Sequence, residues 1–495
     1  MTDTVRYEPV IGLEVHCELA TMTKLFCGCP NEFGAEPNTN VCPICLGLPG
    51  SLPVLNERVV EFALRFAHAL AFDVPEQSIF ARKNYFYPDM PKDYQVSQYE
   101  DPILADGVLD VDGTVVRIER AHLEEDTGKT LHMGGGGRIH DAEYSLVDYN
   151  RAGVPLMEIV SRPDITSAEQ ARGYVSELRA VLAALGVSDV KMEEGSMRVD
   201  ANVSVRPVGE EEFGTKVEVK NMNSLRSLGR AIDHEIERQI AMCEAGERIA
   251  QETRHWDEDE GVTHGMRSKE GSSDYRYFPE PDLVPVAPTD EQRAAARDSV
   301  PELPAAHRAR LVAEWGIAEA DARVLLDVPG LPGYAEAAVA ALTGGTAKDV
   351  VNWCTGDVLA HLNETGLSPE VLPLAPDGLA ELVGLVADGT LSRGLAKDVL
   401  GEALREPKRP KQIVEERGLA QESDEGALAE VIDSVLAANP DTIDAYRAGD
   451  EKQRKKKLGF LMGEAMKATR GSGNPKTLSR ILEARLAGSS GGSSG

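Results

Sequence analysis

The chain has 495 residues, of which 42% are hydrophobic and 27% are charged, and its formal net charge is −30. This length exceeds what one hydrophobic core can serve, so we expect two to four domains. The strongly negative charge excludes a generally basic nucleic-acid-binding protein. No apolar run approaches the roughly 18 residues that a membrane span needs, and the start lacks a signal-peptide pattern. The sequence therefore predicts a cytoplasmic protein with no membrane partner.

The first part of the chain mixes strand and helix patterns. Polar and apolar residues alternate, as is typical of strands with one buried face, in the segments 10–19, 197–206 and 215–220. Apolar residues at helical spacing predict helices over 56–71, 167–186 and 224–247. The polar stretch between the last two strand segments indicates a long hairpin. We predict an α+β fold in which residues 1–288 form a cradle domain on a largely antiparallel sheet.

Strand patterns fade from Thr289 onward, where segments rich in Ala, Leu and Glu are broken by Pro and Gly. Residues 289–404 are therefore expected to form a helical domain. The segment 405–411 has the composition of a linker, and a small helical tail domain is expected over 405–487. The last eight residues, 488–495, have the composition of a flexible Gly/Ser linker.

Glu158 is a carboxylate inside the apolar run Gly153–Val160, where a strand alone would favour Val or Leu. An ionised carboxylate in such a run costs several kcal/mol unless a cation or hydrogen-bond donors meet it. The sequence therefore predicts a partner for Glu158.

Other hard ligands accompany Glu158 in the sequence. Glu14 and His16 lie on one face of the 10–19 strand, and Glu124 and Glu125 follow each other in a second polar segment. Oxygen-rich ligation with one imidazole suits Mg²⁺ or Mn²⁺ better than Zn²⁺. The alternative is that each residue is an ordinary salt-bridge partner, because spacing alone does not show that the fold brings them together.

Four of the seven cysteines occur within nineteen residues, as Cys27-Gly-Cys29 and Cys42-Pro-Ile-Cys45. Two thiolate pairs joined by a short loop are typical of a tetrahedral, structural zinc knuckle. The alternative is a set of reduced or disulfide-bonded cysteines, and a cytosolic compartment disfavours disulfides.

The segment 82–98 crowds cations, tyrosines and amides around two prolines. Lys83, Tyr85 and Tyr87 lie in it and offer groups that can bind phosphate, carboxylate or a terminal adenosine. The alternative interpretation is a rigid surface loop.

Basic residues concentrate near the C-terminus of this otherwise acidic chain. From Arg447 to Arg485 there are eleven Lys or Arg and four Asp or Glu residues. The densest part contains Lys452, Arg454, Lys455, Lys456 and Lys457. This pattern predicts a contact with an RNA backbone, and the alternative is a solvated helix face.

Together these segments resemble the B subunit of the bacterial aspartyl/glutamyl-tRNA(Asn/Gln) amidotransferase. The resemblance covers nearly the whole chain except its Gly/Ser end, and it rests on several long motifs in the same order. The matching stretches are 11–16, 82–89, 122–126, 144–151, 155–161, 189–196, 271–282 and 457–463.

The resemblance implies ATP-dependent phosphorylation of the side-chain carboxylate of Glu-tRNA(Gln) or Asp-tRNA(Asn), followed by attack of ammonia. It implies an amidase-type A subunit that supplies the ammonia, a small C subunit that completes a heterotrimer, and a tail that contacts tRNA. The positions that match the family's Mg²⁺ site are Glu14, His16, Glu125 and Glu158. The residues assigned to ATP are Lys83, Tyr85, Tyr87 and Arg151.

Two alternatives from other classes remain open in the sequence. A non-catalytic RNA-binding scaffold would use the zinc knuckle and the basic tail, and it leaves the acidic residues and His16 unexplained. A stand-alone ATP-dependent ligase would use free ammonia and need no partner subunit.

Overall fold

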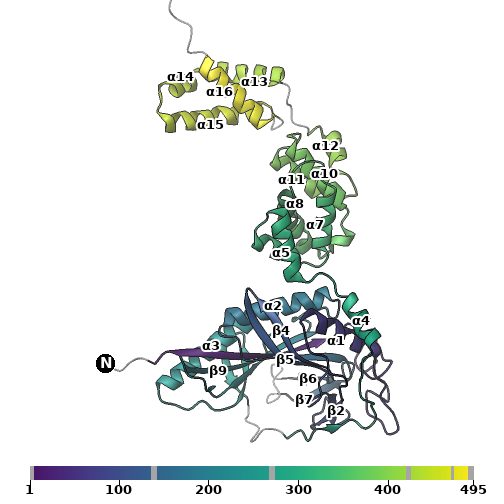
Figure 1. Cartoon of the computed structure of the whole chain (residues 1–495). Coiled ribbons are helices and arrows are strands. Elements are labelled where there is room, and N and C mark those ends of the chain that lie inside the picture. Colours follow the sequence, from purple (N-terminus) through teal and green to yellow (C-terminus); the bar gives the residue numbers. More distant parts are fainter. Residues whose placement is uncertain (1–4, 135–141, 267–273, 420–424, 470–472, 489–495) are drawn as a thin grey trace, which may run out of the picture. The chain divides into compact units, whose positions relative to one another are not determined.

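The computed structural model describes residues 5–134, 142–266, 274–419, 425–469 and 473–488. The chain divides into two compact units, Met1–Pro304 and Ala305–Gly495. Within the described residues, the first unit contains all strands and the second is helical (Figure 1). The predicted α+β fold with a largely antiparallel sheet is confirmed. No helix of the described part is both long enough and apolar enough to cross a membrane.

An eight-stranded sheet forms the centre of the first unit. Its strands are β1 (Tyr7–Glu18), β4 (Leu104–Val111), β5 (Thr114–Glu125), β8 (Pro155–Ser161), β9 (Met197–Pro207), β10 (Val217–Lys220), β11 (Thr253–Asp257) and β12 (Val262–Gly265). They follow the order β12-β11-β10-β9-β1-β8-β5-β4. All neighbouring pairs are antiparallel except β10 and β11, which are parallel. The predicted hairpin is the antiparallel pair β9 and β10.

Two small sheets accompany the large one. The first has the order β13-β2-β3 and the second pairs β6 with β7. Their bounds are β2 (Ala81–Asn84), β3 (Tyr94–Ser97), β6 (Lys129–Met133), β7 (Tyr144–Asp148) and β13 (Phe278–Pro279).

The core of the first unit lies between one face of the large sheet and three helices, α1 (Glu57–Ala69), α2 (Ala168–Ala184) and α3 (Leu225–Glu244) (Figure 1). Strand β1 alternates as its sequence predicts, so that Leu13 and Val15 are buried in this core. Because successive side chains of a strand point to opposite faces, the polar residues of β1 point away from the helices. The sheet therefore presents a polar face on its other side.

Each of these helices begins at a residue whose side chain caps the first turn. The side chains of Asn56, Ser167 and Ser224 accept hydrogen bonds from backbone N–H groups of α1, α2 and α3, respectively. Such caps satisfy donors that have no partner within the helix. The three helices predicted for the first part of the chain are confirmed.

The structure corrects the predicted boundary after residue 288. Helix α4 (Asp290–Asp298) begins with the expected capping box at Thr289, but it packs on the first unit. The Arg293 guanidinium donates to the carbonyls of Val74 and Pro75 at 3.1 and 2.8 Å. The sequence placed α4 with the later helices because local helix signals do not show which core a helix packs against.

The second unit contains two separate hydrophobic clusters. The first includes Leu311 to Val414, and the second includes Leu428 to Leu486. The helices of the first cluster are α5 (Pro304–Trp315), α6 (Glu319–Leu326), α7 (Leu331–Ala340), α8 (Ala347–Trp353), α9 (Leu359–Thr365), α10 (Pro376–Ala387), α11 (Arg393–Ala403) and α12 (Pro410–Arg417). A π-helical turn (Cys354–Val358) joins α8 to α9, and a 3₁₀ turn covers Pro369–Val371.

The second cluster holds α13 (Glu425–Ala438), α14 (Pro440–Ala448), α15 (Glu451–Ala468) and α16 (Pro475–Gly488). The prediction that 405–411 links two helical domains is wrong. This segment joins α11 to α12, and both helices pack in the first cluster. Leu419 still packs there, so the tail begins after residue 419 rather than at 405. The predicted Gly/Ser tract lies, from residue 489 onward, outside the described residues.

One buried hydroxyl gives a stability prediction. Tyr174 in α2 is fully buried, and its hydroxyl has no hydrogen-bond partner among the described residues. Because an unsatisfied buried hydroxyl is costly, Tyr174→Phe should leave stability unchanged or raise it by about 1 kcal/mol in chemical denaturation. The matched control is Tyr334→Phe, which removes a 3.0 Å hydrogen bond to the Leu374 carbonyl and should destabilise its unit. A larger loss for Tyr174→Phe than for Tyr334→Phe would contradict this account.

Candidate functional site

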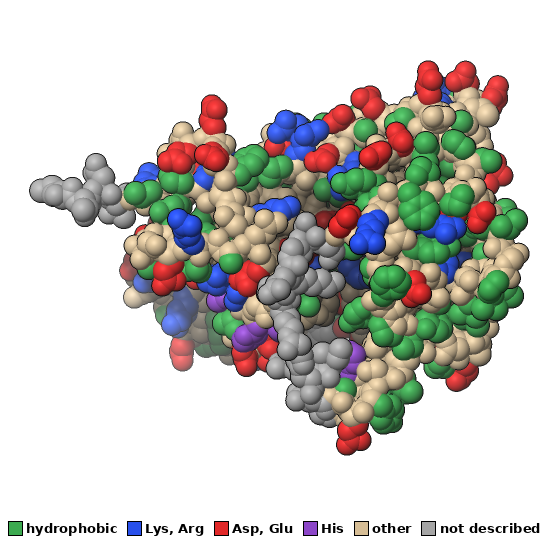
Figure 2. All heavy atoms as spheres, turned by 90° about the horizontal axis from the view of Figure 1, so that it is seen from below, with side chains coloured by type: hydrophobic (Ala, Val, Ile, Leu, Met, Phe, Trp, Pro, Cys, Tyr) green, Lys and Arg blue, Asp and Glu red, His purple; other side chains and the backbone are tan. Residues whose placement is uncertain are grey.

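The polar face of the large sheet brings charged residues from four strands into register. His16 on β1 lies opposite Glu158 on β8 and Arg198 on β9, and Glu158 lies opposite His122 on β5. Directly opposite residues on neighbouring strands point to the same face of a sheet. Viewed from below, this side of the first unit is hollowed, and acidic, basic and histidine side chains surround the hollow (Figure 2).

Three carboxylates and two imidazoles lie within ion-pair distance in this register. His16 Nε2 lies 3.4 Å from Glu158 Oε2 and 3.7 Å from both Glu14 Oε1 and Glu124 Oε1. His122 Nε2 lies 3.3 Å from Glu158 Oε2 and 3.9 Å from Glu124 Oε2. Glu158 thus belongs to two overlapping groups, one with Glu14 and His16 and one with His122 and Glu124, and in each the possible ligand atoms lie within 4.8 Å of one another. We call these five residues the carboxylate–histidine cluster.

Burial and charge act against each other in this cluster. Burial raises the pKa of Glu158, which is 7% exposed, but the charges and hydrogen bonds of His122 and His16 outweigh burial and hold that pKa well below its usual range. Burial lowers the pKa of His122, but Glu158 and Glu124 together raise it to about 9. Burial and the repulsion of Glu158 raise the pKa of Glu14. The carboxylates therefore favour positive charge at this place.

The donor set of the cluster fits a hard divalent cation. Carboxylate oxygens and imidazole nitrogens are ligands that Mg²⁺ and Mn²⁺ accept. The Nδ1 atom of His122 is buried and has no hydrogen-bond partner among the described residues, so its ring is held from the Nε2 side only. A cation between the carboxylates would relieve the repulsion that raises the pKa of Glu14.

The structure separates Glu125 from the other three predicted magnesium ligands. Its side chain points to the opposite face of β5, where it pairs with Lys92 and accepts a hydrogen bond of 2.8 Å from the backbone N–H of Val96. Glu124 takes the place in the cluster that was predicted for Glu125. This correction follows from alternation, because two successive residues of a strand cannot face the same site.

Sequence reasoning also missed His122 as a member of the cluster. The signal was present, since His122 and Glu124 stand two residues apart and therefore share one face of β5. The sequence predicts no strand over this segment, and without a strand the two-residue spacing does not place both side chains on one face.

The residues predicted to bind a nucleotide are divided by the fold. Lys83 lies on β2, which pairs with β3, and the Ser97 hydroxyl on β3 donates to Glu124 Oε2 at 3.2 Å. Burial lowers the pKa of Lys83, but Glu124, Tyr277 and Glu158 outweigh burial and raise it. Burial, and then the nearby charge of Glu124, raise the pKa of Tyr85. Tyr87 is 50% exposed at the surface.

Arg151 follows β7 and is held by the segment after β5. Its guanidinium donates to the carbonyls of Thr127 and Gly128 at 3.1 and 3.0 Å. Its Nε also lies 3.3 Å from Asp126 Oδ2. Asp126 also accepts a hydrogen bond from Arg198 at 2.9 Å. Arg151 and Arg198 therefore share the Asp126 carboxylate beside the cluster.

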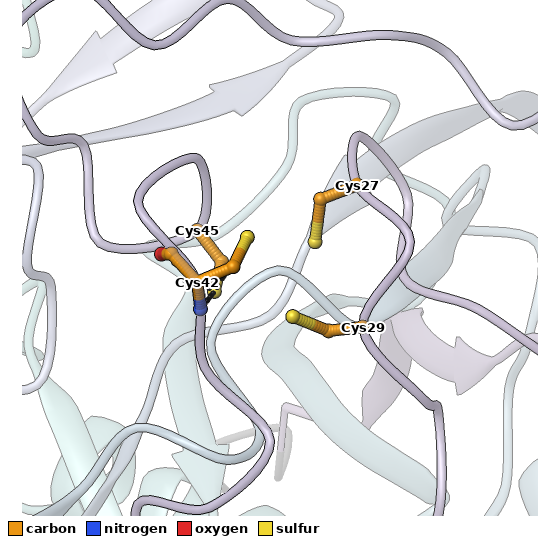
Figure 3. Close-up of side chains that lie close together, drawn as sticks. All are labelled: Cys27, Cys29, Cys42 and Cys45. Atoms are coloured by element: carbon orange, nitrogen blue, oxygen red, sulfur yellow. Dashed lines mark hydrogen bonds between the residues drawn. The ribbon is translucent and has the colours of Figure 1, made fainter.

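The four predicted zinc ligands converge. Their sulfur atoms all lie within 4.8 Å of one another, and none forms a disulfide. Figure 3 shows Cys27 and Cys29 on one loop and Cys42 and Cys45 on another, with the sulfurs directed toward one point. Hydrogen bonding to Cys27 outweighs burial and lowers the pKa of Cys45 to about 5. A closed set of four thiol ligands fits a structural zinc ion.

The basic residues of the tail lie on α15. Lys452, Arg454, Lys455 and Lys456 are exposed, and Lys457 is half-buried. The helix begins at Asp450, whose side chain accepts from the backbone N–H of Gln453. The apolar side of α15 packs in the second cluster of the second unit through Leu461 and Ala465. The cations are therefore presented to solvent.

Comparison with known proteins gives a family for both units. A family described as the GatB/GatE catalytic domain matches residues 9–294, and one described as the GatB domain matches residues 334–486. The chain belongs to the GatB family. The carboxylate–histidine cluster and the four cysteines lie within the GatB/GatE catalytic domain, and α15 lies within the GatB domain.

Relatives of similar length support the same assignment. The B subunit of the aspartyl/glutamyl-tRNA(Asn/Gln) amidotransferase of Thermosynechococcus vestitus is 51% identical over 98% of this chain and 97% of its own length. The protein of the same name from Moorella thermoacetica is 52% identical over 97% of this chain and 100% of its own length. The resemblance to this family of B subunits is therefore confirmed.

The cysteine geometry predicts one tightly held zinc ion per chain. Cys45→Ser should remove that zinc, measured by elemental analysis, and should lower the melting temperature, because structural zinc contributes directly to folding. The matched control is Cys243→Ser, a half-buried cysteine outside the group. Equal zinc content in the wild type and in Cys45→Ser would contradict a zinc site here.

Proposed function

We propose that this chain is the B subunit of a tRNA-dependent amidotransferase that uses ATP to phosphorylate the side-chain carboxylate of Glu-tRNA(Gln) or Asp-tRNA(Asn). Ammonia then displaces the phosphate and gives Gln-tRNA(Gln) or Asn-tRNA(Asn). The observation that supports this most strongly is the carboxylate–histidine cluster, three of whose five residues are buried, within the GatB/GatE catalytic domain. The names of its close relatives point to the same reaction.

The residues of the cluster fit the phosphorylation step. Glu14, His16 and Glu158 form one group that could hold Mg²⁺, and His122, Glu124 and Glu158 form an overlapping one. A Mg²⁺ ion held there would neutralise charge on a transferred phosphoryl group. Lys83 borders the cluster and offers a second positive charge to a phosphate.

Phosphorylation solves a chemical problem of the substrate. The side-chain carboxylate is a poor electrophile, because its oxygen is a bad leaving group. In the proposed step a carboxylate oxygen bonds to the terminal phosphorus of ATP while the bond to ADP breaks. The nitrogen of ammonia then bonds to the acyl carbon, phosphate leaves, and a proton is lost. Water must be kept from the acyl phosphate, which suits a hollow over the sheet.

The ammonia is proposed to come from a partner. The sequence offers no recognisable nucleophile for glutamine hydrolysis, and relatives are named as one subunit of a larger enzyme. The proposed complex is a cytoplasmic heterotrimer with an amidase-type A subunit and a small C subunit.

A non-catalytic RNA-binding scaffold is the competing function. It would need the cysteine group and α15. It gives no reason to gather three carboxylates, two of them buried, against two imidazoles, because burying such carboxylates without a cation costs several kcal/mol. A stand-alone ligase would need no partner, and it predicts full glutamine-dependent activity from the isolated chain.

Substitutions on β5 and β8 test the catalytic proposal. In the assembled complex, with ammonium salt, Mg²⁺-ATP and Glu-tRNA(Gln), Glu158→Gln and Glu124→Gln should each lower amidation roughly 100-fold or more, as removal of one charge-stabilising group does. Glu125→Gln should raise the Mg²⁺ concentration needed for half-maximal rate much less than Glu124→Gln, because only Glu124 reaches the cluster. The control is Glu119→Gln, which changes an exposed residue of the same strand. Unchanged turnover in Glu158→Gln and Glu124→Gln would leave only the scaffold.

The exposed lysines of α15 test the tRNA contact. Lys455→Glu with Lys456→Glu should weaken tRNA binding and reduce the slope of log affinity against log salt by about one for each phosphate that the helix no longer binds. Lys348→Glu, an exposed lysine on α8, is the control. An unchanged salt slope would show that α15 is a solvated surface that does not contact tRNA. With saturating tRNA, amidation should persist in the double variant whether or not α15 binds tRNA.

A further inference from the structure

Four tyrosines from three chain segments gather beside the carboxylate–histidine cluster. The rings of Tyr99 and Tyr277 are stacked, with centroids 4.3 Å apart and an angle of 9° between their planes. Tyr275 meets Tyr277 edge to face at 6.1 Å and Tyr85 at 6.2 Å. None of the four belongs to a hydrophobic core of the described residues. We call them the tyrosine cluster.

The backbone around the tyrosine cluster is held in an unusual conformation. Arg276, between two of the tyrosines, has a φ of +45°, which is rare for a residue other than glycine. The side-chain amide of Asn84 donates to the carbonyls of Tyr275 and Arg276 at 3.1 and 2.8 Å. The backbone N–H of Asn84 also donates to Tyr275. Such local strain persists only where surrounding contacts enforce it, and it gathers at ligand sites.

Lys83 connects the tyrosine cluster to the site of the proposed reaction. Its Nζ lies 5.0 Å from the centroid of the Tyr275 ring. Its strand β2 pairs with β3, whose Ser97 hydroxyl donates to Glu124 Oε2 at 3.2 Å. Tyr99 is 54% exposed, and Tyr275 and Tyr277 are half-buried, so aromatic surface remains open next to buried charge. Half-exposed aromatic rings of this kind are suited to stacking with a nucleobase.

We propose that the tyrosine cluster is the stacking surface for the adenine of an adenosine whose other end reaches the carboxylate–histidine cluster. This inference rests on the proposed function, in which both substrates carry adenosine. On an aminoacyl-tRNA the terminal adenine is separated from the reacting carboxylate only by the ribose, the ester and a short side chain. The base must therefore bind close to the cation site, and Lys83 links that site to the tyrosine cluster. In ATP a ribose and two phosphate groups separate the same base from the reacting terminal phosphorus.

Fluorescence of 2-aminopurine, an adenine analogue that stacking quenches, tests the inference in the assembled complex. One arm uses tRNA with 2-aminopurine as the terminal base, and the other uses 2-aminopurine riboside triphosphate. The inference is supported if either arm shows quenching that Tyr277→Ala and Tyr99→Ala abolish and Tyr277→Phe keeps. The arm that responds shows whether the bound adenine belongs to tRNA or to ATP. The affinity for that ligand should fall roughly 5- to 150-fold in the alanine variants, which is the range for loss of one stacking ring.

Kinetics separate stacking from a general structural defect. The alanine variants should raise the KM for either tRNA or ATP while kcat for saturating substrates changes little, and Tyr277→Phe should restore KM. Phe33→Ala, which changes an 83% exposed aromatic residue outside the tyrosine cluster, is the control. Quenching that is absent in the wild type, or identical in the alanine variants, would overturn the inference. Quenching reports binding alone. It therefore tests the stacking site even if unchanged turnover in Glu158→Gln contradicts the proposed catalytic function.

Discussion

The site depends on the placement of Glu158 between two imidazoles on neighbouring strands. The antiparallel register sets His16 of β1 and His122 of β5 opposite Glu158 of β8. A carboxylate that is 7% exposed is tolerated there because the imidazoles hold its pKa below the usual range. Two further carboxylates at the same place add negative charge that a cation would neutralise. The chemistry that we assign to the protein follows from this one arrangement.

The core on the opposite face fixes that register. Leu13 and Val15 alternate with Glu14 and His16 along β1, and the apolar pair is buried against the helices. A slip of one residue would exchange the two faces and bury the charges in the core. Hydrophobic packing on one side of the sheet therefore determines which side chains meet on the other side. The same constraint explains why Glu124 belongs to the site and Glu125, its neighbour in sequence, pairs with Lys92 behind it.

Much of the site could be predicted where the signal is local. The alternation in β1 placed Glu14 and His16 on one face, the apolar run around Glu158 indicated a buried charge, and the cysteine spacing predicted the converging thiols. Predictions failed where a residue's partner is distant in sequence. Helix α4 has an ordinary capping box but packs against α1, and the segment 405–411 has the composition of a linker but lies inside one helical cluster.

The sequence by itself determined the family, the α+β class, the cysteine group and three of the carboxylate–histidine residues, because motif order, period and spacing are properties of the chain alone. Only the tertiary structure decided that Glu124 and His122 complete the cluster, since strand register is set by packing across the sheet. It also decided that tyrosines 85, 99, 275 and 277 gather beside Lys83. Residues nearly two hundred positions apart become neighbours only when β13 pairs with β2, and no local pattern encodes that contact.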